Sequence, residues 1–247
     1  MNRTLVIGIA LPHVSFDNQS FVSAPSLAEY RRVVVEPAAS SRVVQEVIEG
    51  SVDHANFAGQ PVVNGPASSK QFALKELLLM RRREALQMLA NGGVIVCFAH
   101  PDAQHDGIAG LGSWRRYDWL PPPRDASYDQ LLLPTFGRTN LLVSEPDHPF
   151  ALYVQTFSQK VSYHAQVGEG ALEQVRVFAR SAGGVPLGAQ VAVHAGTVVF
   201  LPTLLKPEEE RALLAETLFQ CLERWDNRLN PHAAQGTAME SSSSAPA

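Results

Sequence analysis

Four side chains that could bind a metal ion or exchange protons follow one apolar run of the sequence. The run spans residues 94–99, and His100, Asp102, His105 and Asp106 all come within the seven residues after it. Imidazole and carboxylate groups together suit Zn²⁺ or a similar ion. The pattern therefore makes His100, Asp102 and His105 candidate metal ligands. The alternative interpretation is a polar loop whose histidines are solvated.

Residues 99–102, Ala-His-Pro-Asp, also resemble the signature of the zinc-dependent LmbE/PIG-L deacetylases. The resemblance implies hydrolysis at a zinc ion. The sequence departs from the signature at Ala103 and Gln104, which stand where that family has a second Asp and a Glu. No His-x-x-His follows to complete the metal shell. A metal-dependent hydrolase with zinc as its cofactor is therefore the alternative hypothesis for this chain.

Three other residues have side chains suited to catalysis. Cys97 is flanked by Val96 and Phe98 in the middle of the apolar run. A nucleophile elbow places its residue on a strained turn between small residues. Cys97 does not fit that pattern, so we expect a buried, inert thiol. His164 and His194 lie on or beside predicted strands, where a histidine serves as a general base or, more often, as a structural residue.

Aromatic and basic side chains gather within the long irregular stretch 107–134. Trp114, Arg116 and Trp119 are the candidates there for binding a ligand or a partner, because Trp, Tyr and Arg dominate interaction hot spots. The alternative is a flap whose aromatic side chains pin it to the domain. On either interpretation the stretch is an insertion, and we expect its deletion to abolish binding and leave a folded core.

Composition and charge exclude several classes of protein. The net charge is −4, so the chain lacks the basic field that nucleic-acid binding requires, and the Arg-Arg-Arg run at 81–83 is expected on a solvated helix face. Two cysteines in apolar segments make neither a disulfide framework nor a cysteine-rich zinc site. No run is long enough for a membrane helix, and the N-terminus lacks the pattern of a signal peptide. We therefore expect a cytoplasmic protein that binds neither nucleic acid nor membrane.

Apolar runs alternate with helical patterns in the first half of the chain. The predicted strands are 5–10, 32–37 and 94–99, then 140–144, 161–167, 175–179, 186–194 and 197–202. The predicted helices are 26–30, 43–48, 68–91 and one that begins at Pro207, whereas 12–25 and 50–66 are predicted to be loops. This order predicts an α/β fold, a flavodoxin- or Rossmann-like three-layer sandwich whose sheet is mostly parallel and partly mixed. Residues 1–229 would form one domain, and the small polar residues 230–247 a disordered tail.

The carboxyl ends of parallel strands are where ligands bind in such folds. Those ends fall near residues 11–13, 37–38, 100–102 and 202–203, which adds His13 to the candidate ligand-binding residues, beside His100 and Asp102. No Gly-x-Gly-x-x-Gly follows the first strand, so a dinucleotide cofactor of the usual kind is not expected.

Two segments together are similar to one family. Residues 89–96 resemble the helix, Gly-Gly and strand passage of class I glutamine amidotransferase-like proteins, including the ThuA-like branch, and 184–202 resemble their late hairpin. The resemblance implies a flavodoxin-like fold. Catalytic members carry a cysteine on an elbow and a late His-x-Glu pair, neither of which stands here. We therefore expect a non-catalytic or divergent member that binds a small molecule or a partner protein without a cofactor. The sequence does not define the oligomeric state.

Overall fold

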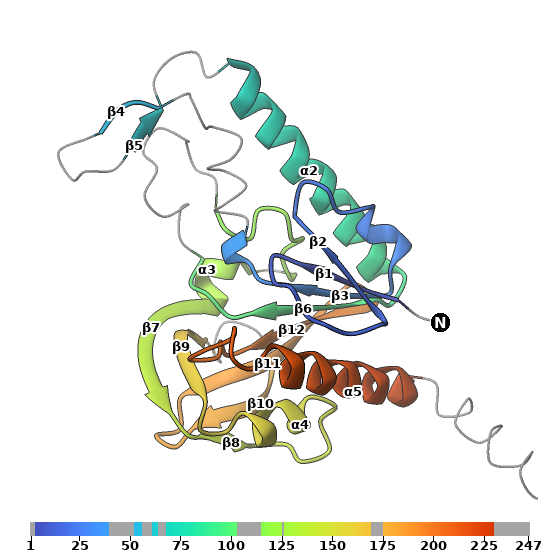
Figure 1. Ribbon diagram of the computed structural model, residues 1–247, viewed down its shortest axis with the longest axis vertical. Coiled ribbons are helices and arrows are strands. Elements are labelled where there is room, and N and C mark those ends of the chain that lie inside the picture. The colour runs from blue at the N-terminus through green and yellow to red at the C-terminus, as the bar shows by residue number, and fades with distance from the viewer. Residues whose placement is uncertain are drawn as a thin grey trace, which may run out of the picture.

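An eight-stranded sheet forms the centre of the protein (Figure 1). The computed structural model describes residues 3–39, 52–55, 61–63, 68–102, 115–124, 126–168 and 175–229. In sheet order the strands are β2 (Phe16–Gln19), β1 (Thr4–Ile7), β3 (Arg32–Val35), β6 (Val94–Phe98), β12 (Gly196–Leu201), β11 (Pro186–Val193), β10 (Val175–Ser181) and β8 (Leu141–Val143). The strands from β2 to β12 pair in parallel, and β11, β10 and β8 extend the sheet with antiparallel pairs. The predicted α/β fold with a mostly parallel, partly mixed sheet is confirmed.

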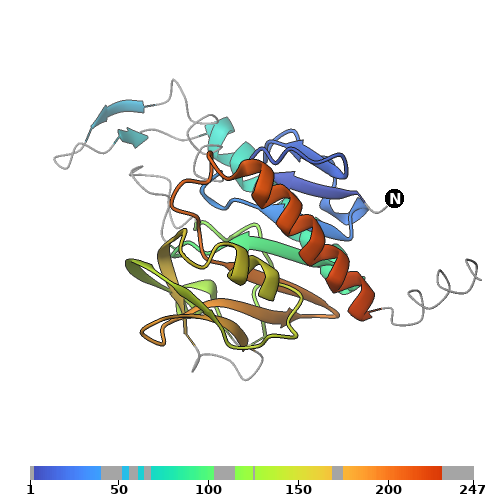
Figure 2. The same cartoon turned by 60° about the horizontal axis from the view of Figure 1, so that its bottom comes forward.

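Helices cover both faces of the sheet, which explains why its central strands are apolar after their first residues, Thr4 and Arg32 in β1 and β3. Every residue of β1, β3 and β6 is buried. On one face α2 (Ser68–Ala90) packs through Leu74, Leu78 and Leu89. On the other face lie α4 (Ala151–Thr156) and α5 (Arg211–Leu229), and Figure 2 shows α5 running across the parallel strands. Cys97 is fully buried in β6, as its neighbours predict.

The remaining elements are short. They are the 3-10 helix η1 (Leu27–Glu29), α3 (Tyr128–Leu131), the antiparallel pair β4 (Val52–Ala55) and β5 (Pro61–Val63), and the antiparallel pair β7 (Leu132–Thr139) and β9 (Val161–Val167). Within the described part of the chain, no helix is both long and apolar enough to cross a membrane.

The junction between α2 and β6 forms as its glycines predict. Gly92 adopts the left-handed conformation with φ at +77°, which costs glycine little because it has no Cβ. Its amide donates to the carbonyl of Leu89, and the amide of Gly93 donates to that of Met88. This pair of bonds is a Schellman motif, which ends the helix and turns the chain into β6 within three residues.

Two predicted loops contain strands, and the last helix begins later than predicted. The stretch 12–25 was predicted to be a loop, yet it contains β2, whose polar residues suit an edge strand that is only partly buried. The stretch 50–66 contains β4 and β5. The last helix begins at Arg211, because 207–210 form turns instead. The predicted helix 43–48, the predicted tail 230–247, and 107–114 of the insertion lie outside the described residues.

The arginine run on α2 is divided between the interior and the surface. Arg82 and Arg83 are exposed as predicted, but Arg81 is buried. Its guanidinium donates to the main-chain carbonyls of 21, 22, 24 and 25 and to the Glu84 carboxylate. The expectation of a solvated face is therefore wrong for Arg81, because the loop after β2 offers carbonyls that only a long cationic donor can reach.

The described part of the predicted insertion belongs to the core. Tyr117, Trp119, Leu120 and Tyr128 are all buried in the cluster that packs against α2. Trp119 has no exposed surface and meets the ring of Phe21 edge-on. The expectation that 107–134 is removable is therefore wrong, since its deletion would take large aromatic side chains out of the core.

Candidate functional site

Five parallel strands end at one edge of the sheet. The register aligns Ile7 of β1 with Gln19 of β2 and with Val35 of β3, while Val35 in turn aligns with Cys97 of β6. Leu201 of β12 aligns with Phe98. The residues that follow these ends therefore meet, although they come from distant parts of the sequence.

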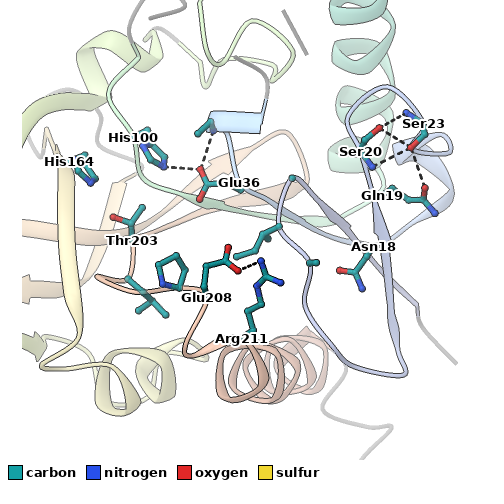
Figure 3. Close-up of a pocket in the computed structure, with 16 residues that line it drawn as sticks. Asn18, Gln19, Ser20, Ser23, Glu36, His100, His164, Thr203, Glu208 and Arg211 are labelled. Atoms are coloured by element: carbon teal, nitrogen blue, oxygen red, sulfur yellow. Dashed lines mark hydrogen bonds and ion pairs between the residues drawn. The ribbon is translucent and has the colours of Figure 1, made fainter. Parts of the chain in front are cut away.

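A cavity of about 790 Å³ lies at this edge (Figure 3). The strand ends contribute Gly8 after β1, Glu36 after β3, His100 after β6 and Thr203 after β12. His164 enters from β9, because β9 is hydrogen-bonded to the segment that follows β12. The place of the cavity agrees with the rule for ligand sites in parallel sheets.

Glu36 and His100 form the central polar contact of the cavity. Nε2 of His100 lies 2.8 Å from Oε1 of Glu36, and each side chain is 17% exposed. The carboxylate is not in line with the ring N–H, so the contact is electrostatic rather than a well-aligned hydrogen bond. Oε1 also accepts a hydrogen bond from the amide of Ala38 at 3.1 Å, which fixes the carboxylate.

The main chain at His100 is held by the segment 115–119. The hydroxyl of Tyr117 lies 2.9 Å from the carbonyl oxygen of His100 and 3.1 Å from its amide nitrogen. Arg116 donates to the carbonyl of Pro101 at 2.6 Å. Tyr117 is buried, which raises the pKa of its hydroxyl well above the ordinary value and keeps it protonated. These bonds position the imidazole of His100 through its backbone.

His164 lies beside His100 with its ring almost parallel. The two ring centroids are 5.8 Å apart and the planes differ by 6°. Burial lowers the pKa of His164, and a positive charge on His100 would lower it further. The ring of His164 is also met edge-on by Phe136, which is 76% exposed. The cavity thus holds one histidine next to a carboxylate and a second that favours its neutral form.

A glycine allows the first strand to approach Glu36 closely. Gly8 has φ at +84°, and a Cβ built there would lie 2.3 Å from Cβ of Ala39 and 2.9 Å from the carbonyl oxygen of Glu36. The amide of Glu36 donates to the carbonyl of Ile7 at 2.9 Å. Any side chain at position 8 would therefore displace the turn that carries Glu36.

The opposite side of the cavity is formed by the turn before α5. Glu208 and Arg211 form an ion pair there (Figure 3). Hydroxyl groups on the cavity wall are also engaged: Ser20 and Ser23 bond to one another at 2.8 Å, and Thr203 donates to the carbonyl of Ser162. Among the described residues that line the cavity, the Glu36–His100 pair and His164 therefore keep hydrogen-bonding capacity for a ligand.

Asp102 faces a different cavity. That cavity has a volume of about 360 Å³ and is lined by Asp102, Arg115, Tyr117 and Asp129, among others. Arg115 bridges Asp102 at 3.4 Å and Asp129 at 3.0 Å, and the amide of Tyr117 also donates to Asp102. Burial raises the pKa of the Asp102 carboxyl, although Arg115 acts in the opposite direction. Asp102 is thus held by structural contacts, away from the cavity that His100 lines.

The other candidate residues are dispersed. His13 packs its ring on Phe219 at 4.2 Å and does not line the edge cavity. Trp119 is buried in the core, and Arg116 is buried at the Pro101 carbonyl. His194 is exposed in the turn between β11 and β12.

Two of the three proposed zinc ligands lie among the described residues. His105 and Trp114 lie outside the described residues. His100 and Asp102, two of the three predicted ligands, face different cavities. Among the described residues, no three His, Cys, Asp or Glu side chains gather as a metal site would require. The set of His100, Asp102 and His105 stays a prediction.

Sequence reasoning missed Glu36 and did not place His164 in the site. Glu36 directly follows a strand, so the rule of carboxyl ends could have identified it together with the neighbouring residues 37–38. His164 was noted as a histidine on a strand, but nothing in the sequence indicates that β9 lies over the end of β12.

Comparisons with known proteins show a distant similarity in structure. No protein-family model matches the sequence, and no curated protein matches it. Among solved structures, the chain is similar to two cytoplasmic proteins from Salmonella typhimurium. STM1381 has a TM-score of 0.49 at 12% identity over 91% of this chain and 98% of that one. STM3548 has a TM-score of 0.47 at 11% identity over 90% and 98%.

A third similar structure is a proposed GMP synthase component from Thermoplasma acidophilum. Its TM-score is 0.39 at 8% identity, over 93% of this chain and 99% of that one. At these sequence identities, the similarity concerns the fold of the backbone, and no activity of those proteins is assigned to this chain.

Proposed function

We propose that this protein binds a small polar molecule in the edge cavity, as a divergent member of the class I glutamine amidotransferase-like proteins. The observation that carries the proposal is the convergence of Glu36, His100 and His164 on one cavity at the carboxyl edge of the sheet. Small-molecule sites combine a concave wall with a few well-placed polar groups, and this cavity has both.

Divergence from glutaminase chemistry is part of the proposal. The elbow cysteine of catalytic members has no counterpart here, because Cys97 is buried within β6 and burial raises the pKa of its thiol. After β12 stands Thr203, in a segment without a His-x-Glu pair.

The experiment follows the ring signals of His100 and His164 by NMR while a panel of small acids, amides, sugars and nucleosides is added. At least one compound should shift both signals. In Ala10→Trp, where the new ring would fill the cavity from an exposed position, the affinity should fall at least about tenfold.

A matched control is Val14→Trp on the same loop. Val14 is 94% exposed and does not line the cavity, so binding should be unchanged. Equal affinity in both tryptophan variants, or no compound that shifts either signal, contradicts the proposal.

A further inference from the structure

The two nitrogens of the His100 ring have different surroundings. Nε2 is buried and faces Glu36 at 2.8 Å. Nδ1 makes no hydrogen bond to any residue that the structure describes, and the side chain keeps 17% of its surface exposed in the cavity wall. Because Nε2 is buried, Nδ1 is the ring nitrogen that a bound molecule could reach.

This arrangement is suited to proton transfer. A carboxylate on one side of an imidazole fixes the ring and stabilises the imidazolium that forms when the other nitrogen accepts a proton. The Tyr117 hydroxyl holds the His100 backbone, and the Ala38 amide holds the Glu36 carboxylate, so both partners are fixed before a ligand arrives. Pre-positioned groups of this kind lower the cost of reaching the reactive geometry.

Water is the nucleophile that this cavity leaves available. The hydroxyls of Ser20 and Ser23 bond to each other, and that of Thr203 donates to a main-chain carbonyl. No cysteine is among the described residues that line the cavity. A covalent intermediate on those residues is therefore disfavoured, and a water molecule next to Nδ1 is the group to be activated.

The charges of the cavity favour a neutral substrate. Glu36 and Glu208 place two carboxylates in the wall, and Arg211 is paired with Glu208. A strongly anionic substrate would meet these carboxylates without an uncommitted arginine or lysine among the described lining residues. An ester with an uncharged acyl group avoids that repulsion.

We propose that His100, positioned by Glu36, acts as a general base and acid in the hydrolysis of a small neutral ester, which deepens and rests on the proposed binding function. Nδ1 takes a proton from water while the water oxygen forms a bond to the acyl carbon. The bond from that carbon to the leaving oxygen then breaks, and Nδ1 returns the proton to the leaving oxygen. The products are an acid and an alcohol, and the histidine ends neutral.

The test measures hydrolysis of p-nitrophenyl acetate by the full chain. We expect His100→Gln to lower kcat about 100-fold, within the usual range for a general base. Glu36→Gln keeps an acceptor for the Ala38 amide but loses the charge, so it should lower kcat about tenfold with KM unchanged. Glu36→Asp should restore part of that loss, and added imidazole should accelerate the reaction of His100→Ala more than it accelerates the reaction without protein.

The control for unspecific histidine reactivity is His194→Asn, because His194 is exposed and Asn tolerates its φ of +55°. Its rate should equal that of the wild type. The proposal is overturned if His100→Gln hydrolyses the ester as fast as the wild type does, or if Glu36→Gln changes only KM.

Failure of the binding function looks different from failure of this inference. If panel compounds shift the His164 signal but the ester reaction is independent of His100, only the acid–base role is overturned. If no panel compound shifts either histidine signal and the ester is not hydrolysed, the binding function and the inference that rests on it are both overturned.

Discussion

His100 and Asp102 are separated by a single proline, yet they serve different regions of the molecule. His100 lies at the edge cavity with one ring nitrogen uncommitted. Asp102 lies in the smaller cavity, where Arg115 and the Tyr117 amide engage both carboxylate oxygens. The difference shows that a dense polar run in a sequence need not be one site. Polar groups that keep unused hydrogen-bonding capacity can bind a ligand, whereas polar groups whose capacity is used stabilise the fold.

Arg81 is the most fully committed polar side chain of the structural region, so its loss should have the largest effect. Arg81→Met would remove the guanidinium donor from four buried or partly buried carbonyls, and would leave the Glu84 carboxylate with the Leu27 amide as its donor. We expect a loss of about 3 kcal/mol in the free energy of unfolding. Urea denaturation measures it, with the exposed neighbour Arg83→Met as the control that should change stability by less than about 0.5 kcal/mol. Equal losses in the two variants would contradict the distinction.

His148 provides a second contrast with His100, because both ring nitrogens of His148 have hydrogen-bond partners. Its Nδ1 accepts from the amide of Phe150 and its Nε2 lies 2.7 Å from Gln190, while the ring stacks on Phe178 at 3.9 Å. Burial lowers the pKa of His148 from 6.5 to about 4, so protonation occurs more readily in the unfolded chain.

The sign of the pH effect follows from that shift. The contribution of His148 to stability is complete above pH 6.5 and is lost as the pH falls from there toward 4. Between pH 7 and pH 5 the wild type should lose about 2 kcal/mol more unfolding free energy than His148→Gln does. Parallel pH profiles of the two proteins would show that the buried ring does not resist protonation.

Tyr117 joins the two regions, because its amide donates to Asp102 while its hydroxyl holds the backbone of His100. Tyr117→Phe should lower the unfolding free energy by about 1 kcal/mol and slow p-nitrophenyl acetate hydrolysis severalfold. The matched control is Tyr128→Phe, another buried tyrosine, whose hydroxyl donates to Pro121 at 2.7 Å. It should lose similar stability and keep its rate. If both variants lose rate equally, Tyr117 has no specific role in positioning His100.

Zinc should have the smallest effect. Since His100 and Asp102 face different cavities, we expect less than one equivalent of zinc after purification without chelators. The content, measured by atomic emission, should be the same in the wild type, His100→Ala and Asp102→Asn. One full equivalent that is lost in both variants would instead establish a zinc site at His100 and Asp102, as the metal-dependent hydrolase hypothesis requires.

The fold was predictable where local chemistry decides it. The helical pattern of α2, the glycines at 92–93 and the apolar run of β6 each determine a structure within a few residues. β2 was missed because Asp17, Asn18 and Gln19 are polar, and only the neighbouring β1 makes a strand of them.

The site was predictable only in part, for a physical reason. His100 follows from the rule that ligands bind at the carboxyl ends of strands, and Glu36 falls under the same rule. His164 and the burial of Arg81 depend on which segments pack together over long distances in sequence. No spacing or residue type in the sequence carries that information.

The pairing of β6 with β12 has a consequence for how the protein folds. Val94 is paired with Thr197, and the 102 residues between them must be brought into a closed loop before that ladder exists. Contacts between such distant residues form slowly, because closing the loop costs conformational entropy before any hydrogen bond offsets that cost. During synthesis the cavity would therefore remain incomplete until β12 and Thr203 have left the ribosome. A chain that stops short of β12 would leave one edge of β6 unpaired, although β3 pairs with the other, and it would lack the Thr203 side of the cavity.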